Sequence, residues 1–210
     1  MKIPLSKLEL RVLEISYKKK LSHLGSCLTA VQLIDNVYKV KKKEDIFILS
    51  QGHAGLALYV ILEKYLKKNA EDLFDKHGVH PNRNLSDKIY CSSGSLGSAL
   101  PIAVGMAVAD RKRDVFVLIS DGELAEGSCW EALRIAGEMR LDNLKILVNA
   151  NGYSAYGKVD TELIDLRLQY FFPSLVAKTN MFKYPSYLQG LSGHYHTLKK
   201  EQYKEIINET

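Results

Sequence analysis

The stretch Val115-Phe116-Val117-Leu118-Ile119-Ser120-Asp121-Gly122-Glu123 joins an apolar run to an acidic turn. About thirty residues later a second apolar run, Lys145-Ile146-Leu147-Val148, leads into Asn149-Ala150-Asn151-Gly152. Short apolar runs that are bounded by turn residues are typical of buried strands. Because neighbouring parallel strands end at the same edge of a sheet, we expect Asp121 and Asn151 to lie close together.

Both side chains offer oxygen atoms of the kind that Mg²⁺ prefers, and the backbone carbonyl of Tyr153 would add a third. The first turn also precedes a predicted helix, and a helix N-terminus favours a phosphate group. Gly122 would let the backbone approach that phosphate closely. Each residue alone has a simpler interpretation, in which Asp121 caps a helix and Asn151 makes a turn. The two together, each following an apolar strand, favour a site for a metal ion bound with a diphosphate.

The rest of the chain alternates predicted helices with predicted strands, which indicates an α/β fold with a mostly parallel sheet and helices on both faces. Apolar spacing predicts helices over 5–20, 28–40, 54–66, 94–109 and 126–140, and a further strand over 46–49. Residues 69–93 are polar and predict a loop. After Asp160 the pattern weakens, and we expect a short helix over 163–172, irregular structure over 173–198 and a helical piece over 201–208. Residues 1–210 are therefore expected to form a single domain with a shortened, irregular tail over about 161–210.

Composition narrows the class of protein. The chain has 210 residues, 46% of them apolar, and a net charge of +5. Its excess lysines form short clusters rather than an arginine-rich stripe with aromatic residues, which argues against a nucleic-acid partner. No run approaches the roughly 18 apolar residues of a membrane span, and the N-terminus has no signal-peptide pattern. Cys27, Cys91 and Cys129 are too far apart to indicate a disulfide framework or a zinc site, so we expect reduced thiols and a cytoplasmic location.

Four of the six histidines stand in turns that contain glycine or proline. They are His23, His53, His80 and His194. A further histidine, His196, stands two residues after His194. An imidazole in a loop can bind phosphate or hydroxyl oxygens and transfer protons near neutral pH. One such histidine is more often an ordinary surface residue, and only the convergence of several would indicate a site. His77 lacks this turn context and is interpreted as an ordinary residue.

A series of short segments, in a fixed order, carries a family resemblance. The segments are Ser22-His23-Leu24-Gly25, Asp45 to His53, His80-Pro81, Gly94-Ser95-Leu96-Gly97, Ser120 to Gly127 with Trp130-Glu131-Ala132, Leu141-Asp142-Asn143-Leu144, and Asn151-Gly152. With these segments the chain resembles the N-terminal, diphosphate-binding part of transketolase, a thiamine diphosphate enzyme. The resemblance runs from about residue 10 to about residue 160 and continues more weakly to the end.

The resemblance implies thiamine diphosphate and Mg²⁺ as cofactors. It implies Asp121, Asn151 and the carbonyl of Tyr153 as metal ligands. Gly122 is then a diphosphate contact, and Glu123 beside it is also placed among the cofactor-binding residues. Further cofactor contacts are Gly94 and Leu96, at the thiamine rings, and His53, which lies close to both diphosphate and substrate.

The resemblance also implies a set of catalytic residues. His23 and His80 are implied to bind the hydroxyl groups of the donor sugar and to help proton transfer, together with His53. His194 is implied to be the late histidine near the diphosphate and the acceptor, with His196 as the alternative. Glu126 is implied to be the glutamate at the subunit interface that links two cofactor sites. Its simpler interpretation is a glutamate in the first turn of a helix.

Several positions depart from the family pattern. Leu24 replaces a usual proline, Ser98-Ala99 replaces Gln-Gly, and Ser120 stands where glycine is frequent. Asn149 replaces a carboxylate that the family places near the cofactor ring. The tail after Asp160 is shorter than in the family, and a further strand–helix segment is missing, so the sheet edge and the dimer surface are open questions.

The function that the resemblance implies is transfer of a two-carbon ketol unit from a ketose, expected to be phosphorylated, to an aldose in carbohydrate metabolism. In the family the activating glutamate comes from a second, pyrimidine-binding domain, for which this chain has no room. We therefore expect a split enzyme, in which the chain forms a heterotetramer with a separate C-terminal subunit.

Two alternatives remain open. One is the alpha component of another thiamine diphosphate enzyme, such as a 2-oxo acid dehydrogenase, although the histidine-rich loops argue against it. The other is a degenerate, non-catalytic or regulatory subunit, which Asn149 and the short tail favour and the retained histidines oppose.

Overall fold

A four-stranded parallel sheet forms the centre of the molecule, in a computed structural model that describes residues 5–154, 157–179 and 183–209. The strand order is β1 (Ile46–Leu49), β2 (Val115–Ser120), β3 (Leu144–Ala150) and β6 (Leu175–Lys178). The first three strands are the three that the apolar runs predict. Asp121 follows β2 directly and Asn151 follows β3, so both residues stand at the carboxyl edge of the sheet, as expected.

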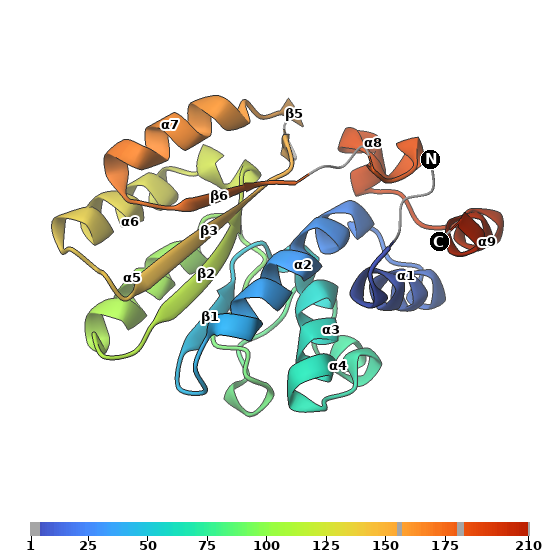
Figure 1. The fold of residues 1–210 in the computed structure, drawn as a ribbon, viewed down its shortest axis with the longest axis horizontal. Coiled ribbons are helices and arrows are strands. Elements are labelled where there is room, and N and C mark those ends of the chain that lie inside the picture. The colour runs from blue at the N-terminus through green and yellow to red at the C-terminus, as the bar shows by residue number, and fades with distance from the viewer. Residues whose placement is uncertain (1–4, 155–156, 180–182, 210) are drawn as a thin grey trace.

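Helices cover both faces of this sheet, which confirms the predicted α/β class (Figure 1). One group consists of α1 (Lys7–Lys19), α2 (Leu24–Val40), α3 (Gly55–Leu66) and α4 (Ala70–His77). The opposite group consists of α5 (Ala99–Ala109), α6 (Gly127–Glu138) and α7 (Thr161–Phe171). The side chains of β2 alternate between two cores, because successive residues of a strand point to opposite faces. Leu118 joins the core beneath α2, whereas Val117 and Ile119 join the core beneath α5 and α6.

Several helix boundaries differ from the sequence expectation. Helix α2 begins at Leu24 rather than at residue 28, and α5 begins at Ala99 rather than at residue 94. The segment 69–93, expected to be a loop, contains α4 and a short 3₁₀ turn, Leu85–Asp87. Asn69 caps α4 by accepting hydrogen bonds from two backbone N–H groups of its first turn. A short polar helix with such a cap is hard to distinguish from a loop by apolar spacing alone.

The expectation of irregular structure over 173–198 is wrong in part. This segment contains β6, which pairs with β3 in parallel register, Leu147 opposite Leu175. It also contains a 3₁₀ turn (Ser186–Leu188) and helix α8 (Gly190–His194), and it is followed by α9 (Lys200–Glu209). Strand β6 is only four residues long, Leu-Val-Ala-Lys, and its three apolar residues are too short a run to indicate a strand by themselves. At this edge position Leu175 is largely exposed.

The tail is fastened to the helices of the first group. The carboxylate of Glu9 on α1 is buried and accepts hydrogen bonds from the Tyr184 hydroxyl and the Lys183 ammonium group, both at 2.5 Å. Tyr17 on α1 stacks on Tyr203 of α9 with ring centroids 4.4 Å apart. These contacts hold α8 beside the start of α2, as Figure 1 shows.

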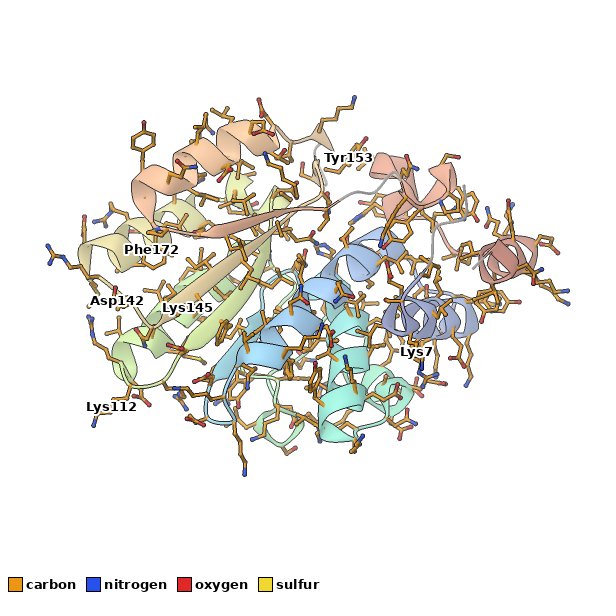
Figure 2. The ribbon with its side chains drawn as sticks, in the orientation of Figure 1. Lys7, Lys112, Asp142, Lys145, Tyr153 and Phe172 are labelled. Atoms are coloured by element: carbon orange, nitrogen blue, oxygen red, sulfur yellow. The ribbon has the colours of Figure 1, made fainter. Side chains whose placement is uncertain are left out.

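The remaining elements are short and lie near the carboxyl ends of the strands. They are two 3₁₀ turns, Gly52–Ala54 and Gly122–Ala125, and a hairpin of β4 (Tyr153–Ser154) and β5 (Gly157–Lys158). Figure 2 shows Tyr153 at this end of the sheet and Lys145 near the other. All three cysteines are buried and free. In the described part of the chain, no helix has the length and apolar character needed to cross a membrane.

Candidate functional site

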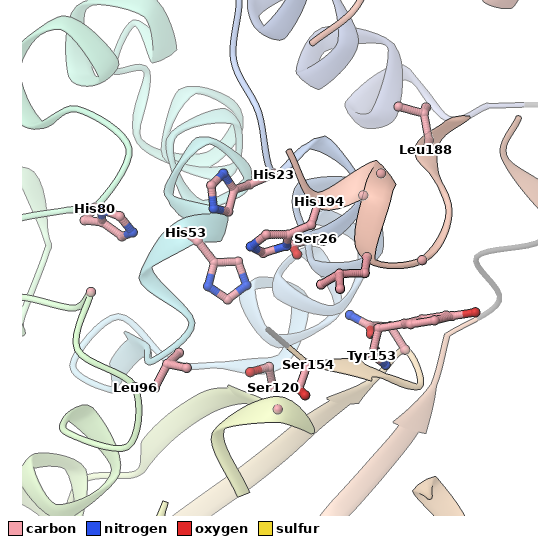
Figure 3. A pocket seen from close by; sticks show the side chains of 17 residues that line it. His23, Ser26, His53, His80, Leu96, Ser120, Tyr153, Ser154, Leu188 and His194 are labelled. Carbon is pink, nitrogen blue, oxygen red and sulfur yellow. Dashed lines mark hydrogen bonds between the residues drawn. The ribbon is translucent and has the colours of Figure 1, made fainter. Parts of the chain in front are cut away.

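A cleft with a volume of about 200 Å³ lies at the carboxyl edge of the sheet (Figure 3). Loops from distant parts of the sequence meet there, because parallel strands send their carboxyl ends to one edge. Nine of the residues expected from the sequence line it: His23, His53, His80, Gly94, Leu96, Gly122, Asn151, Tyr153 and His194. The structure therefore brings together residues from both ends of the chain.

Eight further lining residues were not named as site residues: Gly25, Ser26, Ser120, Ser154, Leu188, Gly190, Leu191 and Gly193. Ser120 could have been found, because it departs from the family pattern directly before the acidic turn. The four residues from 188 to 193 reach the cleft only through the docking of the tail on α1 and α2. Apart from the turn histidine His194, which follows Gly193 directly, nothing in the local sequence around them indicates that contact.

Asp121 lies beneath the cleft rather than on its surface. Its side chain is buried, with Oδ1 accepting a hydrogen bond from the Gly122 N–H at 3.0 Å and Oδ2 from the Gly152 N–H at 2.6 Å. Burial raises the pKa of this carboxyl group to about 6, although these N–H groups act in the opposite direction. A buried carboxylate with a raised pKa is a group whose charge a bound cation would stabilise.

The neighbouring oxygen atoms complete a set suited to a hard cation. The Oδ1 atom of Asn151 accepts from the Tyr153 N–H at 2.9 Å, which holds the amide at the turn beside Asp121. In the described residues no group of three histidine, cysteine or acidic side chains could hold a metal ion. A metal site at this edge therefore depends on one carboxylate, one amide oxygen and one backbone carbonyl, a donor set of hard oxygens that fits Mg²⁺.

Gly122 has a steric requirement of its own. A Cβ atom on this residue would come within 2.9 Å of the Cβ of Ser154 and 3.1 Å of its Cα. The turn after β2 thus packs directly against the β4 hairpin. Because Gly122 has no side chain, its backbone can line the cleft.

The rings of His23, His53 and His194 lie close together where they line the cleft. The ring centroid of His23 lies 4.1 Å from that of His194 and 5.7 Å from that of His53, and the His53 and His194 centroids are 5.6 Å apart. Burial lowers the pKa of His23 to about 4 and that of His53 to about 3, with further lowering by the neighbouring histidines. Burial also lowers the pKa of His194. These imidazoles are therefore neutral near pH 7 and can both donate and accept hydrogen bonds.

The geometry distinguishes His194 from His196. The carbonyl of His194 accepts a hydrogen bond from the backbone N–H of His23 at 2.8 Å, and its ring lines the cleft. The ring of His196 lies away from the cleft, with Nε2 2.9 Å from Gln202 Oε1. His80 also lines the cleft and is exposed. The ring of His77 is buried against Asp87 at 2.9 Å, a structural contact.

Glu123 does not line the cleft. Its side chain is fully buried and accepts hydrogen bonds from the hydroxyl of Ser50 at 2.6 Å, the N–H of Ser120 at 2.9 Å and the N–H of Gly97 at 3.2 Å. Each of these donors belongs to a segment that carries a cleft residue. Glu123 therefore ties the cleft loops together from the interior of the protein.

Two other residues singled out in the sequence also lie off the cleft. Glu126 is the N-cap residue of α6, and its side chain contacts Gly97, where an added Cβ would come within 2.7 Å of it. Asn149 is fully buried beneath the sheet edge. It donates to the Thr29 hydroxyl at 3.0 Å and accepts from the Thr179 hydroxyl at 2.9 Å.

Fold and site together define a class of protein: a parallel α/β domain with a cleft at the carboxyl edge of its sheet, which is where such domains bind their ligands. The chain belongs to the transketolase family, since the family model described as "Transketolase, thiamine diphosphate binding domain" matches residues 18–172. The resemblance on which the sequence expectations rest is therefore confirmed.

Relatives with curated names include two bacterial proteins, each named as one subunit of an apulose-4-phosphate transketolase. The chain is 33% identical to the one from Phocaeicola vulgatus, over 71% of this chain and 60% of the relative. It is 32% identical to the one from Actinobacillus succinogenes, over 61% of this chain and 54% of the relative. The chain thus matches little more than half the length of these relatives.

Among solved structures, transketolase from Leishmania mexicana matches with a TM-score of 0.77 at 20% identity. The match covers 95% of this chain and 39% of that one. It shows that the fold of nearly all of this chain is that of one part of a larger transketolase chain.

Proposed function

We propose that this chain is the N-terminal, diphosphate-binding component of a two-subunit, transketolase-like transferase. The reaction would move a two-carbon ketol unit from a ketose, in phosphorylated form, to an aldose acceptor. The observation that carries the proposal is the cleft in which the Gly122 and Asn151 turns face three neutral histidines. Thiamine diphosphate, when bound, would supply the carbon nucleophile for this transfer.

One end of the cleft would hold the diphosphate with Mg²⁺. Asp121, Asn151 and the Tyr153 carbonyl would be the metal ligands, and the backbone of Gly122 would contact the diphosphate. The buried carboxylate of Asp121 and its hard-oxygen neighbours support this role. Gly94 and Leu96, which line the adjacent wall, would contact the thiamine rings.

The other end would bind the sugar. Neutral His23, His53 and His194 can donate to hydroxyl or phosphate oxygens and can accept protons, and His80 lines the same cleft. Glu123 would support this site indirectly, because its side chain binds the segments of Ser50, Gly97 and Ser120 together.

The partner would be a C-terminal, pyrimidine-binding subunit, in a heterotetramer. The two bacterial relatives are themselves named as subunits of a transketolase, which supports a split enzyme. We further propose that residues 1–210 act as one domain, that Glu126 lies at the subunit interface, and that the enzyme is cytoplasmic. The free thiols of all three cysteines support the location.

Mixing experiments test the assignment. The purified chain alone should show negligible ketol transfer, and transfer should appear once the partner subunit is added, with ketose donors preferred over pyruvate. A pair that decarboxylates pyruvate instead would favour a 2-oxo acid enzyme. A pair without turnover on any donor would favour a non-catalytic role.

Asp121→Ala tests the metal assignment. In the assembled pair the substitution should abolish Mg²⁺-dependent binding of thiamine diphosphate in calorimetry, because it removes the charged metal ligand. Asp142→Ala, at an exposed position far from the cleft, is the matched control. An unchanged affinity in Asp121→Ala would remove the metal assignment.

A further inference from the structure

The side chain of Ser22 contacts the first histidine of the cleft. Ser22 Oγ lies 2.7 Å from Nδ1 of His23, within hydrogen-bond distance. Ser22 immediately precedes His23 at the start of α2, and neither the sequence pattern nor the cleft lining assigns it a role.

The backbone holds His23 in a fixed position. Its φ angle is 62°, in the left-handed region that a residue with a side chain rarely adopts. The His23 N–H donates to the His194 carbonyl at 2.8 Å, and the His23 carbonyl accepts from the Cys27 N–H at 3.2 Å. The ring itself packs against that of His194, at 4.1 Å between centroids, and its Nδ1 atom contacts the Ser22 hydroxyl.

The direction of this hydrogen bond follows from the partners that are present. In a neutral imidazole one ring nitrogen is a donor and the other an acceptor, and the hydrogen bond at one nitrogen sets the tautomer. Among the described residues, the Ser22 hydroxyl has no second hydrogen-bond acceptor, and Nε2 of His23 has no partner. Donation from the hydroxyl to Nδ1 satisfies both groups with one bond. The reverse direction would leave the hydroxyl proton without a protein acceptor.

We propose that Ser22 is a positioning residue that donates its hydroxyl proton to Nδ1 of His23, so that the imidazole keeps its proton on Nε2. The cleft then receives an N–H donor from His23 rather than a basic nitrogen. This inference rests on the proposed function in one respect, namely that the N–H of His23 donates to an oxygen atom of the sugar. His23 would accordingly orient and polarise the substrate, and proton removal would fall to another histidine of the cleft.

Nitrogen NMR of the chain labelled with ¹⁵N-histidine tests the tautomer directly, without partner or cofactor. At about pH 7.5, where the imidazole is neutral, the two ring nitrogens of His23, assigned by comparison with His23→Gln, should show a protonated Nε2 and an unprotonated Nδ1. Ser22→Ala should convert this single form into a mixture of tautomers, whereas Ser22→Thr, which keeps a hydroxyl group, should preserve it. Ser174→Ala, whose hydroxyl donates to the Phe172 carbonyl, controls for the loss of a hydroxyl elsewhere.

A second measurement connects the tautomer to the reaction. In the assembled pair, Ser22→Ala should lower kcat/KM for the ketose by about tenfold, the usual cost of one hydrogen bond, and Ser22→Thr should restore it. A protonated Nδ1 in the wild-type chain, or an unchanged tautomer ratio in a folded Ser22→Ala chain, would overturn the proposal. If the wild-type pair lacked ketol transfer, the proposed function would fail, and the NMR comparison would still decide the role of Ser22.

Discussion

Glu123 shows how much one buried side chain can organise. At the scale of a single residue, its carboxylate accepts hydrogen bonds from the end of β1, the end of β2 and the loop before α5. Buried donors that lose their acceptor retain the full cost of desolvation. The residue therefore stabilises the protein and the shape of the cleft at the same time.

Glu123→Ala should lower the free energy of unfolding by about 3 kcal/mol, because several buried donors lose their shared acceptor. Urea denaturation followed by circular dichroism measures the change. Glu131→Ala, at an exposed position on α6, should stay within about 0.5 kcal/mol of the unaltered chain. A loss below about 1 kcal/mol for Glu123→Ala would contradict the network described above.

The histidine cluster predicts a dependence of stability on pH. An unfolded histidine titrates at about pH 6.5. The folded-state pKa is lower, at about 4 for His23 and about 3 for His53. The folded protein therefore binds these protons less readily than the unfolded chain. The stability that these groups contribute should be fully present above the unfolded pKa and should be lost as the pH drops towards the folded-state values.

Denaturation in urea between about pH 7.5 and about pH 4.5 covers the upper part of this window and measures the slope there. His53→Gln removes one of the two depressed groups and should make the decline shallower. An equal slope in the two proteins would show that His53 takes up its proton as readily in the folded state as in the unfolded chain.

At the scale of elements, α8 depends on a contact made far from the cleft. Glu9 on α1 holds Tyr184 and Lys183, and the carbonyl of Tyr184 accepts from the Gln189 side chain at 2.6 Å. Gln189 precedes α8, which carries His194 to the cleft. A hydrogen-bonded path thus connects the first helix of the protein to the helix of a cleft histidine.

Tyr184→Phe should loosen this attachment, because the buried Glu9 carboxylate loses one of its donors. Amide hydrogen exchange of residues 183–194, and of the His23 N–H that donates to His194, should become about tenfold faster. Tyr170→Phe is the control, since Tyr170 on α7 is 90% exposed. Equal exchange rates in the two variants would mean that Glu9 does not hold the tail.

At the scale of the whole molecule, the described sheet ends at β6 with apolar side chains in solvent. Leu175 on β6 is 64% exposed, whereas Leu147, its partner on β3, is only 8% exposed. Exposed apolar groups on an edge strand favour association with other chains. The same substitution at these two paired positions should therefore have different consequences.

Leu147→Gln should destabilise the chain by about 3 kcal/mol, because it removes buried apolar surface and buries an amide. Leu175→Gln should change stability by less than about 0.5 kcal/mol and should reduce self-association. Urea denaturation and light scattering measure the two effects. A large loss of stability in Leu175→Gln would indicate that β6 is covered in solution.

The sequence by itself determined the elements whose signals are local. Apolar runs before Asp121 and Asn151 predicted two adjacent strands, and helical spacing predicted the helices around them. Turn residues marked His23, His53 and His80, which all reach the cleft. The physical reason is that strand and helix periodicity, and the conformations allowed to turn residues, are properties of short segments.

Only the tertiary structure decided the features that depend on distant contacts. It places the ring of His194, and not that of His196, at the cleft. It also buries the side chains of Glu123 and Asn149, and it adds β6 as the fourth strand of the sheet. Each outcome depends on packing between residues far apart in the chain. A short segment carries no record of such packing, since edge strands and docked tails gain their free energy from the partner surface rather than from their own periodicity.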